Sequence, residues 1–328
     1  MNFPCKVDSL DGIDLAGRSL HLAIGMFDGV HLGHQSVIES AVHSARRQDG
    51  VAGVLTFHPH PSALFRPEDP TRLIMEPASK TKFFHGLGAD LVIEQPFDRK
   101  FAAIPADRFP DYLLERLPTL DSIYVGENWR FGRGREGDVA FLIERARPLG
   151  ISIISMPRLQ RNGKPISSSR IRKCLLEGEV EEANSLLGYT YFVEGTVCSG
   201  RGMGARLGFP TLNIPWPGDL RPRFGVYGVR AAPADAAGEE APWGARARRV
   251  PGIANFGVRP TVEADATEPV LEVHLLAGES PFGPGDRLRV EWLFFHRPEE
   301  KFADLDALKA RIVRDCREVR DRFPGGPG

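Results

Sequence analysis

Two histidines three residues apart stand where a strand-like run passes into a stretch with helical spacing. In the segment AIGMFDGVHLGHQSVI, the run of residues 20–26 leads through Gly25 and Asp28 into a helix that should begin near His31. Such a turn aims backbone N–H groups and the positive end of the helix dipole beyond the carboxyl end of the strand, which suits a phosphate. Because of their spacing, His31 and His34 should present both imidazoles on one face of the first helical turn.

The chemistry that this pair suits is attack of a phosphate oxygen on the α-phosphorus of ATP. Charge builds on the phosphoryl oxygens in that reaction. The protein mainly positions the reacting groups and neutralises this charge. Two histidines at a helix start can donate hydrogen bonds to those oxygens without acting as nucleophiles. A pair of surface or zinc-binding histidines is the alternative, but the HExxH spacing and a ready third ligand are missing.

Three serines, Ser167 to Ser169, stand just before another predicted helix, which carries Arg170 and Arg172. Hydroxyls, N–H groups and guanidinium groups would gather at one helix start, which predicts a second phosphate clamp. Taken alone, the serine run is better explained as an ordinary N-cap.

The glycine-rich run GTVCSGRGMGARLGFPTLNI contains Gly200, Gly202 and Gly204. It is neither a Walker motif nor a dinucleotide fingerprint, because no GK[ST] follows and Pro210 and Pro215 prevent a long helix. The run predicts a flap whose backbone approaches phosphates. An ordinary glycine-rich loop is the alternative.

Three further residues have side chains suited to phosphoryl transfer. In FPTLNI, Thr211 and Asn213 share one face of an extended chain, where a hydroxyl and an amide oxygen could hold Mg²⁺ together with ATP phosphates. In VLEVHLL, Glu272 faces away from the core side of Leu271 and Val273 and could accept the proton of an attacking hydroxyl. An exposed strand glutamate is the alternative interpretation.

The elements that must position these residues change in kind along the chain. Apolar runs alternate with polar stretches of helical spacing in the first half, which predicts a parallel sheet with crossover helices. These runs lie at 20–26, 51–57, 90–93, 122–126 and 151–156. After about residue 187, short strands broken by Gly and Pro predict an antiparallel sheet or small barrel. For a chain of 328 residues we therefore expect two domains, residues 1–186 and 187–328.

Two segments complete this layout. The stretch from Phe302 to Phe323 carries one apolar stripe on a charged helix, which should lie across the barrel as a lid on its core. Residues 231–249 are rich in Ala, Gly, Pro and charge, and indicate a flexible insert between two strands.

Composition restricts the class of protein. Lys plus Arg (42) nearly balances Asp plus Glu (43), so no long-range field draws the chain to nucleic acid or anionic lipid. The first residues, MNFPCKVDSLDG, carry acids and lack an apolar h-region, so we expect no leader, and no apolar run reaches membrane-spanning length. Its four cysteines have no CxxC spacing, which favours reduced thiols. These features predict a cytoplasmic protein that binds neither nucleic acid nor membrane.

Four motifs in the first half resemble the FMN adenylyltransferase module of the bacterial bifunctional riboflavin kinase/FAD synthetase family: GMFDGVHLGH, TFHPHP, VGENWRFGRGREGD and ISSSRIR. The resemblance implies a Rossmann-like nucleotidyltransferase domain with His31 and His34 at the catalytic centre. It implies an ATP site of Gly25, Phe27, Asp28, Gly33, Ser168 and Arg172, and flavin contacts from His58, Pro59, Asn128 and Phe131. Asn128 stands where many members carry Asp, and Trp129 where Phe is usual.

The second half, with RPTV (259–262) and HRPEEKF (296–302), resembles the riboflavin kinase module of the same family, a small six-stranded barrel. The resemblance implies Glu272 as the base for the ribityl 5′-hydroxyl. It implies Thr211 and Asn213 as magnesium contacts, Gly200 and Gly204 in the ATP flap, and Arg297 with Glu299 near the flavin. Ala205 stands where Arg is usual and Leu212 replaces the Ala of PTAN, which predicts weaker ATP binding by this module.

Together these resemblances imply an enzyme that converts riboflavin and ATP to FMN and ADP, and then FMN and ATP to FAD and diphosphate, with Mg²⁺. One alternative is a monofunctional adenylyltransferase whose C-terminal module only binds flavin. The others are a non-catalytic flavin-binding regulator and a related transferase acting on pantetheine or nicotinate phosphate. The presence of His31, His34 and Glu272 disfavours the regulator, and the predicted barrel disfavours the third alternative.

Overall fold

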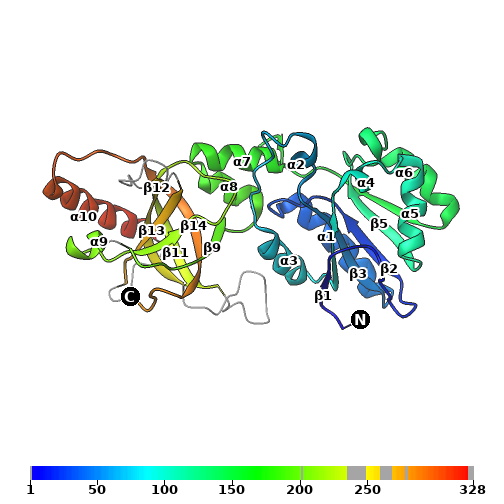
Figure 1. The fold of residues 1–328 in the computed structure, drawn as a ribbon, viewed down its shortest axis with the longest axis horizontal. Helices are drawn as coiled ribbons and strands as arrows, with labels where there is room; N and C mark the ends of the chain where they lie inside the picture. Colours follow the sequence, from blue (N-terminus) through cyan, green and yellow to red (C-terminus); the bar gives the residue numbers. More distant parts are fainter. Residues whose placement is uncertain (1, 201, 235–248, 259–267, 278–279, 324–328) are drawn as a thin grey trace. The chain divides into compact units, whose positions relative to one another are not determined.

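The computed structural model describes residues 2–200, 202–234, 249–258, 268–277 and 280–323. The chain divides into two compact units, Met1–Ser168 and Ser169–Gly328. Figure 1 shows a sheet with helices in the first unit and a barrel in the second.

A six-stranded sheet forms the centre of the first unit. Its strands lie in the order β1-β4-β3-β2-β5-β6, and neighbouring strands pair in parallel. They are β1 (Cys5–Val7), β2 (Leu20–Ile24), β3 (Val51–His58), β4 (Leu91–Pro96), β5 (Leu120–Gly126) and β6 (Ser152–Met156). Strand β2 is buried throughout, as expected for a parallel sheet covered on both faces. The five predicted strands are confirmed; β1 was not predicted, because three partly exposed residues leave no periodic signal.

The chain leaves the middle of this sheet in two directions. From β2 it passes to β3 and then β4 on one side, whereas β5 and β6 lie on the other side. In such a sheet, ligands bind outside the carboxyl ends of the strands at the point where the order reverses. The segments that follow β2, β3 and β5 therefore meet at one edge, and they carry most residues of the predicted adenylyl-transfer site.

Helices cover the sheet and share its core. Helix α1 (Leu32–Arg47) packs on β2, β3 and β5, helix α3 (Pro77–Gly86) on β4, and helix α6 (Val139–Ala146) on β6. The other helices of the unit are α2 (Pro61–Phe65), α4 (Arg99–Ala102) and α5 (Phe109–Arg116). Short 3₁₀ turns are η1 (Ala106–Arg108), η2 (Arg133–Arg135) and η3 (Arg147–Leu149), and a small hairpin joins β7 (Gln160–Arg161) to β8 (Lys164–Pro165).

Six antiparallel strands form the second unit, in the order β10-β13-β12-β11-β14-β9. They are β9 (Phe192–Thr196), β10 (Leu212–Pro215), β11 (Gly225–Pro233), β12 (Val250–Val258), β13 (Pro269–Leu275) and β14 (Arg287–Arg297). An antiparallel bridge joins the two edge strands, with Cys198 N 2.8 Å from Asn213 O, so the sheet nearly closes. The predicted six-stranded barrel is confirmed. Its helices are α7 (Ser168–Glu177), α8 (Val180–Leu187), α9 (Met203–Arg206) and α10 (Leu305–Asp321).

The predicted terminal helix, α10, is confirmed, but it lies on the opposite face of the sheet from the one expected. Inside the barrel, the rings of Tyr227 and Trp292 are fully buried with centroids 4.3 Å apart. Helix α10 instead packs against Val226, Ile253 and Phe294. Val226 is next to the inward Tyr227, and Ile253 pairs with Gly228, so both belong to the outer face. Phe294 also pairs with Gly228, because a register shift in β14 separates it from the inward Trp292. The helix therefore covers the outside of the barrel and not its inner core.

Two features noted in the sequence lie where the structure does not describe the chain. The RPTV motif (259–262) and residues 235–248 of the predicted insert lie outside the described residues. No helix in the described part of the chain combines the length and the apolar character that crossing a membrane requires. All four cysteines carry free thiols.

Helix α8 precedes the barrel strands in sequence and lies against β14. Asn184 on α8 donates from Nδ2 to Trp292 O (2.9 Å) and accepts from Tyr191 N (2.7 Å). The apolar face of α8, which includes Leu186 and Leu187, is fully buried. The division between the compact units thus lies N-terminal to the predicted boundary at 186/187, which stays a prediction.

We expect a fragment of residues 169–328 to be more stable than a fragment of residues 187–328. The shorter fragment lacks Asn184 and most of the apolar face of α8, and burying one leucine-sized side chain contributes about 1.5–3 kcal/mol. Its thermal midpoint should therefore be lower by several degrees. Calorimetry of both fragments measures the difference, and equal midpoints would show that α8 does not stabilise the barrel.

Candidate active sites

The first turn of α1 carries the histidine pair. His31 is the N-cap of the helix, and its Nδ1 accepts a hydrogen bond from His34 N (3.3 Å). The two imidazoles stack with ring centroids 3.5 Å apart and planes inclined by 18°. Both rings therefore lie at one face of the helix start, as the spacing predicts.

Two glycines leave room for the rings around this pair. Phe27, with a positive φ of 48°, packs edge-on against His34 with centroids 5.4 Å apart. A side chain at Gly25 would lie 2.9 Å from the Phe27 ring, and one at Gly33 would lie 3.2 Å from the His31 ring. Distances this short show that glycine is required at Gly25 for the present packing of Phe27.

Burial lowers the pKa of the His31 imidazole from 6.5 to about 4, although a backbone hydrogen bond partly opposes this. The ring is therefore neutral near pH 7. Because Nδ1 accepts a hydrogen bond from His34 N, the ring proton belongs on Nε2. His31 can thus donate one hydrogen bond without carrying a charge.

Asp28 holds the loop between β2 and α1. Its carboxylate, 3% exposed, accepts hydrogen bonds at Oδ1 from Ile74 N (3.0 Å) and Met75 N (3.4 Å). Its main-chain carbonyl accepts a hydrogen bond from Ser168 Oγ (2.9 Å). The serine of the ISSSRIR motif is therefore joined to the histidine-bearing loop.

The predicted flavin contacts follow β3 and β5. His58 is exposed at the end of β3 and Pro59 follows it, while Asn128 is exposed just after β5. Phe131 is only 5% exposed and stacks on Trp129 with ring centroids 4.8 Å apart. The topology brings these segments to the same sheet edge as the start of α1. Phe131 lies there as a buried ring in an aromatic cluster with Trp129.

Arg172 belongs to α7, in the second compact unit. Its expected contact with the triphosphate therefore stays a prediction. Arg170 on the same helix pairs with Glu182 on α8, with Nη2 2.5 Å from Oε1.

Strand register in the barrel places two of the predicted kinase residues, Glu272 and Asn213, in one row with Asn255. Glu272 on β13 lies directly opposite Asn213 on β10 and opposite Asn255 on β12. Residues paired in this way have Cβ atoms about 4.5–5.5 Å apart and share a face. Asn255 Nδ2 donates to Glu299 Oε1 (3.3 Å), and Asn213 Nδ2 donates to Thr211 O (3.3 Å). Four of the predicted residues thus form a continuous polar strip on the outer face.

The glycine-rich flap lies directly on this strip. A methyl group at Gly200 would overlap the side chain of Asn213. A methyl group at Gly204 would lie 2.5 Å from Phe209 O and 3.2 Å from Thr211 Oγ1. The backbone of the flap can approach this turn so closely only because these positions lack a side chain.

Two further residues lie near these sites. Lys80 on α3 is 6% exposed and donates to Met26 O (3.2 Å) and Thr56 Oγ1 (3.0 Å). His274, on the same face of β13 as the predicted base, has its Nδ1 2.9 Å from Pro210 O. Strand alternation places His274 on the face of Glu272 from the sequence alone, whereas nothing in the sequence distinguishes Lys80 from an ordinary helical lysine.

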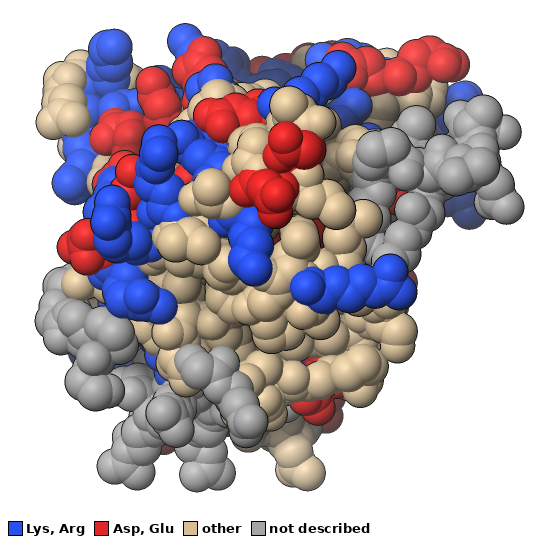
Figure 2. Space-filling model, turned by 90° about the vertical axis from the view of Figure 1, so that its left-hand side faces the viewer, with Lys and Arg blue, Asp and Glu red and all other residues tan. Residues whose placement is uncertain are grey.

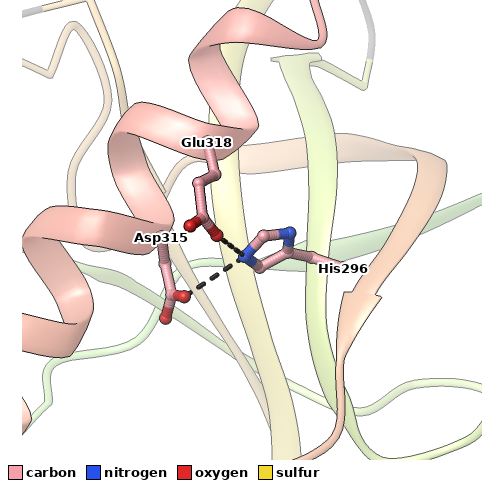
Figure 3. A group of neighbouring side chains, drawn as sticks. All are labelled: His296, Asp315 and Glu318. Carbon is pink, nitrogen blue, oxygen red and sulfur yellow. Dashed lines mark hydrogen bonds and ion pairs between the residues drawn. The ribbon is translucent and has the colours of Figure 1, made fainter.

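Arg297 takes part in a separate network where α10 crosses β14. His296, Asp315 and Glu318 place their ligand atoms close enough to hold a metal ion (Figure 3). However, Asp315 already accepts hydrogen bonds from Arg297 Nη2 (2.7 Å) and Arg311 Nε (2.9 Å). Burial raises the pKa of Asp315, but the bonds and charge of Arg297, with Arg311 and His296, hold it below its usual value. We therefore interpret this cluster as an ion-pair network that fixes α10 to β14.

Charges of both signs lie side by side on the described part of the face drawn in Figure 2, next to uncharged surface. This mixture agrees with a formal net charge of −1. An anionic substrate must therefore be held by local groups such as those described above.

We expect His31→Ala to destabilise the first unit by about 1 kcal/mol, because α1 loses its N-cap; His31→Asn keeps a capping oxygen and should lose less. The pKa of His31 is lower in the folded unit, so the unfolded chain binds more protons between pH 4 and 6.5. The stability that neutral His31 contributes is complete above pH 6.5 and is lost as the pH falls toward 4. Hydrogen exchange of the α1 amides measures both effects. An identical pH slope in wild type and His31→Asn would contradict this prediction.

Comparison with known proteins assigns both units. Residues 16–170 match the FAD synthetase family model, and residues 187–323 match the riboflavin kinase family model. The bifunctional riboflavin kinase/FMN adenylyltransferase of Escherichia coli (strain K12) is 34% identical over 302 residues, covering 92% of this chain and 92% of its own. The protein of the same name from Bacillus subtilis (strain 168) is 32% identical over 303 residues, covering 91% and 90%.

The fold also matches a solved structure. A protein described as a macrolide-efflux protein from Streptococcus pneumoniae superposes with a TM-score of 0.83 and 25% identity, over 97% of this chain and 99% of that chain. That description concerns the other protein, whereas the two family models and the relatives agree on both halves of this chain. The chain therefore belongs to the bifunctional riboflavin kinase/FMN adenylyltransferase family.

Proposed function

We propose that this chain makes FAD in two steps. The second unit transfers the γ-phosphoryl group of ATP to riboflavin, giving FMN and ADP. The first unit transfers AMP from ATP to FMN, giving FAD and diphosphate. The observation that carries this proposal is that each unit has its own constellation: His31 stacked on His34 at the start of α1, and Glu272 paired with Asn213 in the barrel.

In the adenylyl-transfer step, a phosphate oxygen of FMN attacks the α-phosphorus of ATP, and the bond to the bridging oxygen breaks as diphosphate leaves. The positive end of α1 and the N–H groups of both imidazoles stabilise the charge that develops on the phosphoryl oxygens. Asp28 and Ser168 keep the loop in position through their hydrogen bonds. Gly25, Phe27 and Gly33 complete the ATP site within the first unit, and His58, Pro59, Asn128 and Phe131 contact the flavin. Arg172 stays a predicted ATP contact.

In the kinase step, the carboxylate of Glu272 accepts the proton of the ribityl 5′-hydroxyl as that oxygen attacks the γ-phosphorus and ADP leaves. The flap brings its backbone to the phosphates at Gly200 and Gly204. Arg297 and Glu299 contact the flavin; the bond from Asn255 orients Glu299, and Asp315 orients Arg297.

We propose Mg²⁺ for the kinase step, because the donors fit it: the Thr211 hydroxyl and the Asn213 amide oxygen are hard oxygen ligands. Bound there with ATP, the ion would neutralise phosphate charge. Of the two departures predicted to weaken ATP binding, Leu212 has a side chain that is 7% exposed and lies opposite Val273 of the barrel interior. Its bulk therefore fills the core, and the exposed Ala205 is the departure that bears on ATP binding.

We further propose that the protein works in the cytoplasm with riboflavin, FMN and ATP as its small-molecule partners. Four free thiols suit a reducing compartment. The near-zero net charge supports partners other than nucleic acid or membrane.

Reciprocal variants test the division of labour between the units. His34→Ala should abolish FAD formation from FMN and leave FMN formation intact. Glu272→Gln should lower FMN formation by about 100-fold or more, the usual contribution of a general base, and leave FAD formation from supplied FMN intact. Chromatography after incubation with riboflavin or FMN, ATP and Mg²⁺ measures both products. Equal loss of both activities in a folded variant would sink the two-site assignment.

Gly200→Ala should impair FMN formation, because the added methyl group overlaps Asn213 and must displace the flap or the amide. Gly283→Ala is the matched control, since Gly283 lies in the same unit with nothing within 4 Å of its added Cβ. FAD formation from FMN should be unchanged in both variants. Normal kinase rates in Gly200→Ala would show that the flap does not need to lie this close during turnover.

A further inference from the structure

Lys80 is a buried cation without a counter-ion at the edge of the first site. Its ammonium group donates to Met26 O (3.2 Å) and Thr56 Oγ1 (3.0 Å), and these neutral oxygens are its only partners among the described residues. An ammonium group has three N–H donors, so one donor has no acceptor among those residues. Buried lysines are rare unless they are paired, because removing a charge from water is costly.

The charged groups that face Lys80 are held by other partners. The Asp28 carboxylate, on the β2–α1 loop, accepts two backbone N–H groups. Glu94 on β4 forms an ion pair with Lys6 on β1, with Nζ 2.6 Å from Oε1. Burial lowers the pKa of Lys80 from 10.5 to about 8; the charges of Asp28 and Glu94 oppose this shift and that of Lys6 adds to it.

The ammonium group also holds the backbone that carries the ATP-site residues. Met26 lies between Gly25 and Phe27, and its carbonyl accepts hydrogen bonds from both Lys80 Nζ and Thr56 Oγ1 (3.2 Å). Thr56 is near the carboxyl end of β3. Lys80 therefore fixes the peptide at the point where β2 gives way to the phosphate-binding loop.

We propose that Lys80 is a positioning residue for adenylyl transfer: it fixes the Met26 peptide below the phosphate site, and the phosphates of ATP supply the counter-charge that it lacks in the free protein. This inference rests on the function proposed for the first unit. Coupling of this kind is reciprocal, so bound ATP strengthens the hold of Lys80 on its proton, and loss of that proton weakens ATP binding.

Three variants of the full chain test the proposal. Lys80→Met removes the charge and the donors, and Lys80→Gln keeps an N–H donor without the charge. Lys82→Met is the control, because Lys82 is exposed on the same helix. Both Lys80 variants should lose about 100-fold in kcat/KM for ATP during FAD formation from FMN, the usual effect of misplacing a reacting group by about 1 Å. FMN formation from riboflavin in the same samples reports on the second unit and should not change.

A pH profile separates the charge from a purely structural role. In wild type, kcat/KM for ATP should fall above about pH 8, where Lys80 in the free protein loses its proton. The fall in kcat should lie at higher pH, because bound phosphates retain that proton. Phosphate monoesters have their second pKa near about 6 and do not titrate in this range. Lys80→Met should lack the alkaline fall.

Several results would overturn the proposal. One is a kcat/KM for ATP in Lys80→Met or Lys80→Gln within about twofold of wild type, since coupling between sites is typically about fivefold or more. Another is a fall of kcat/KM at alkaline pH that persists in Lys80→Met. If Lys80→Met does not fold, a wild-type profile that stays flat to about pH 10, near the ordinary lysine pKa, overturns it alone. Wild-type protein that forms no FAD would instead contradict the function proposed for the first unit.

Discussion

The buried carboxylate of Asp28 is the interaction on which the first site depends. It accepts N–H groups from Ile74 and Met75, just before α3, while the carbonyl of the same residue accepts the hydroxyl of Ser168. The loop needs such restraints because Val30 has a φ of 34°, which is unfavourable for a β-branched residue. Without them, the helix start would lose its fixed position at the sheet edge. One residue thus joins three distant segments around the turn proposed to bind phosphate.

The barrel positions its site in a different way, through strand register. A shift of one residue in β13 would turn Glu272 inward and Leu271 or Val273 outward. The aromatic interior, where Tyr227 packs against Trp292, makes such a shift costly because the inner face must stay apolar. The polar strip outside the barrel is therefore fixed by the packing inside it.

These differences explain what the sequence could predict. Most strands of both units were predictable because apolar runs and alternation report burial directly, whereas the three partly exposed residues of β1 leave no such signal. The stacking of His31 on His34 follows from local helical geometry. The environment of Lys80 was not predictable, because its partners come from other segments, β3 and the loop after β2. The stripe on α10 predicted a packed helix, but not which face of the barrel it covers. The inward direction of Leu212 likewise depends on its pairing with Val273.

The groups that hold the first site are more buried than the proposed base of the second site, and the difference matches the proposed chemistry. Asp28, His31 and Lys80 are each at most 6% exposed, and the side chain of each makes a hydrogen bond to a backbone N–H or carbonyl group. Adenylyl transfer as proposed needs no base or nucleophile from the protein, so its rate depends on dipoles and charges fixed before the substrate arrives, and burial fixes them. Glu272 and Asn255 are only half-buried. A base, the role proposed for Glu272, must meet an incoming hydroxyl. A place on the outer face next to Asn213, which the flap approaches at Gly200, gives it that access, and the register keeps it in position.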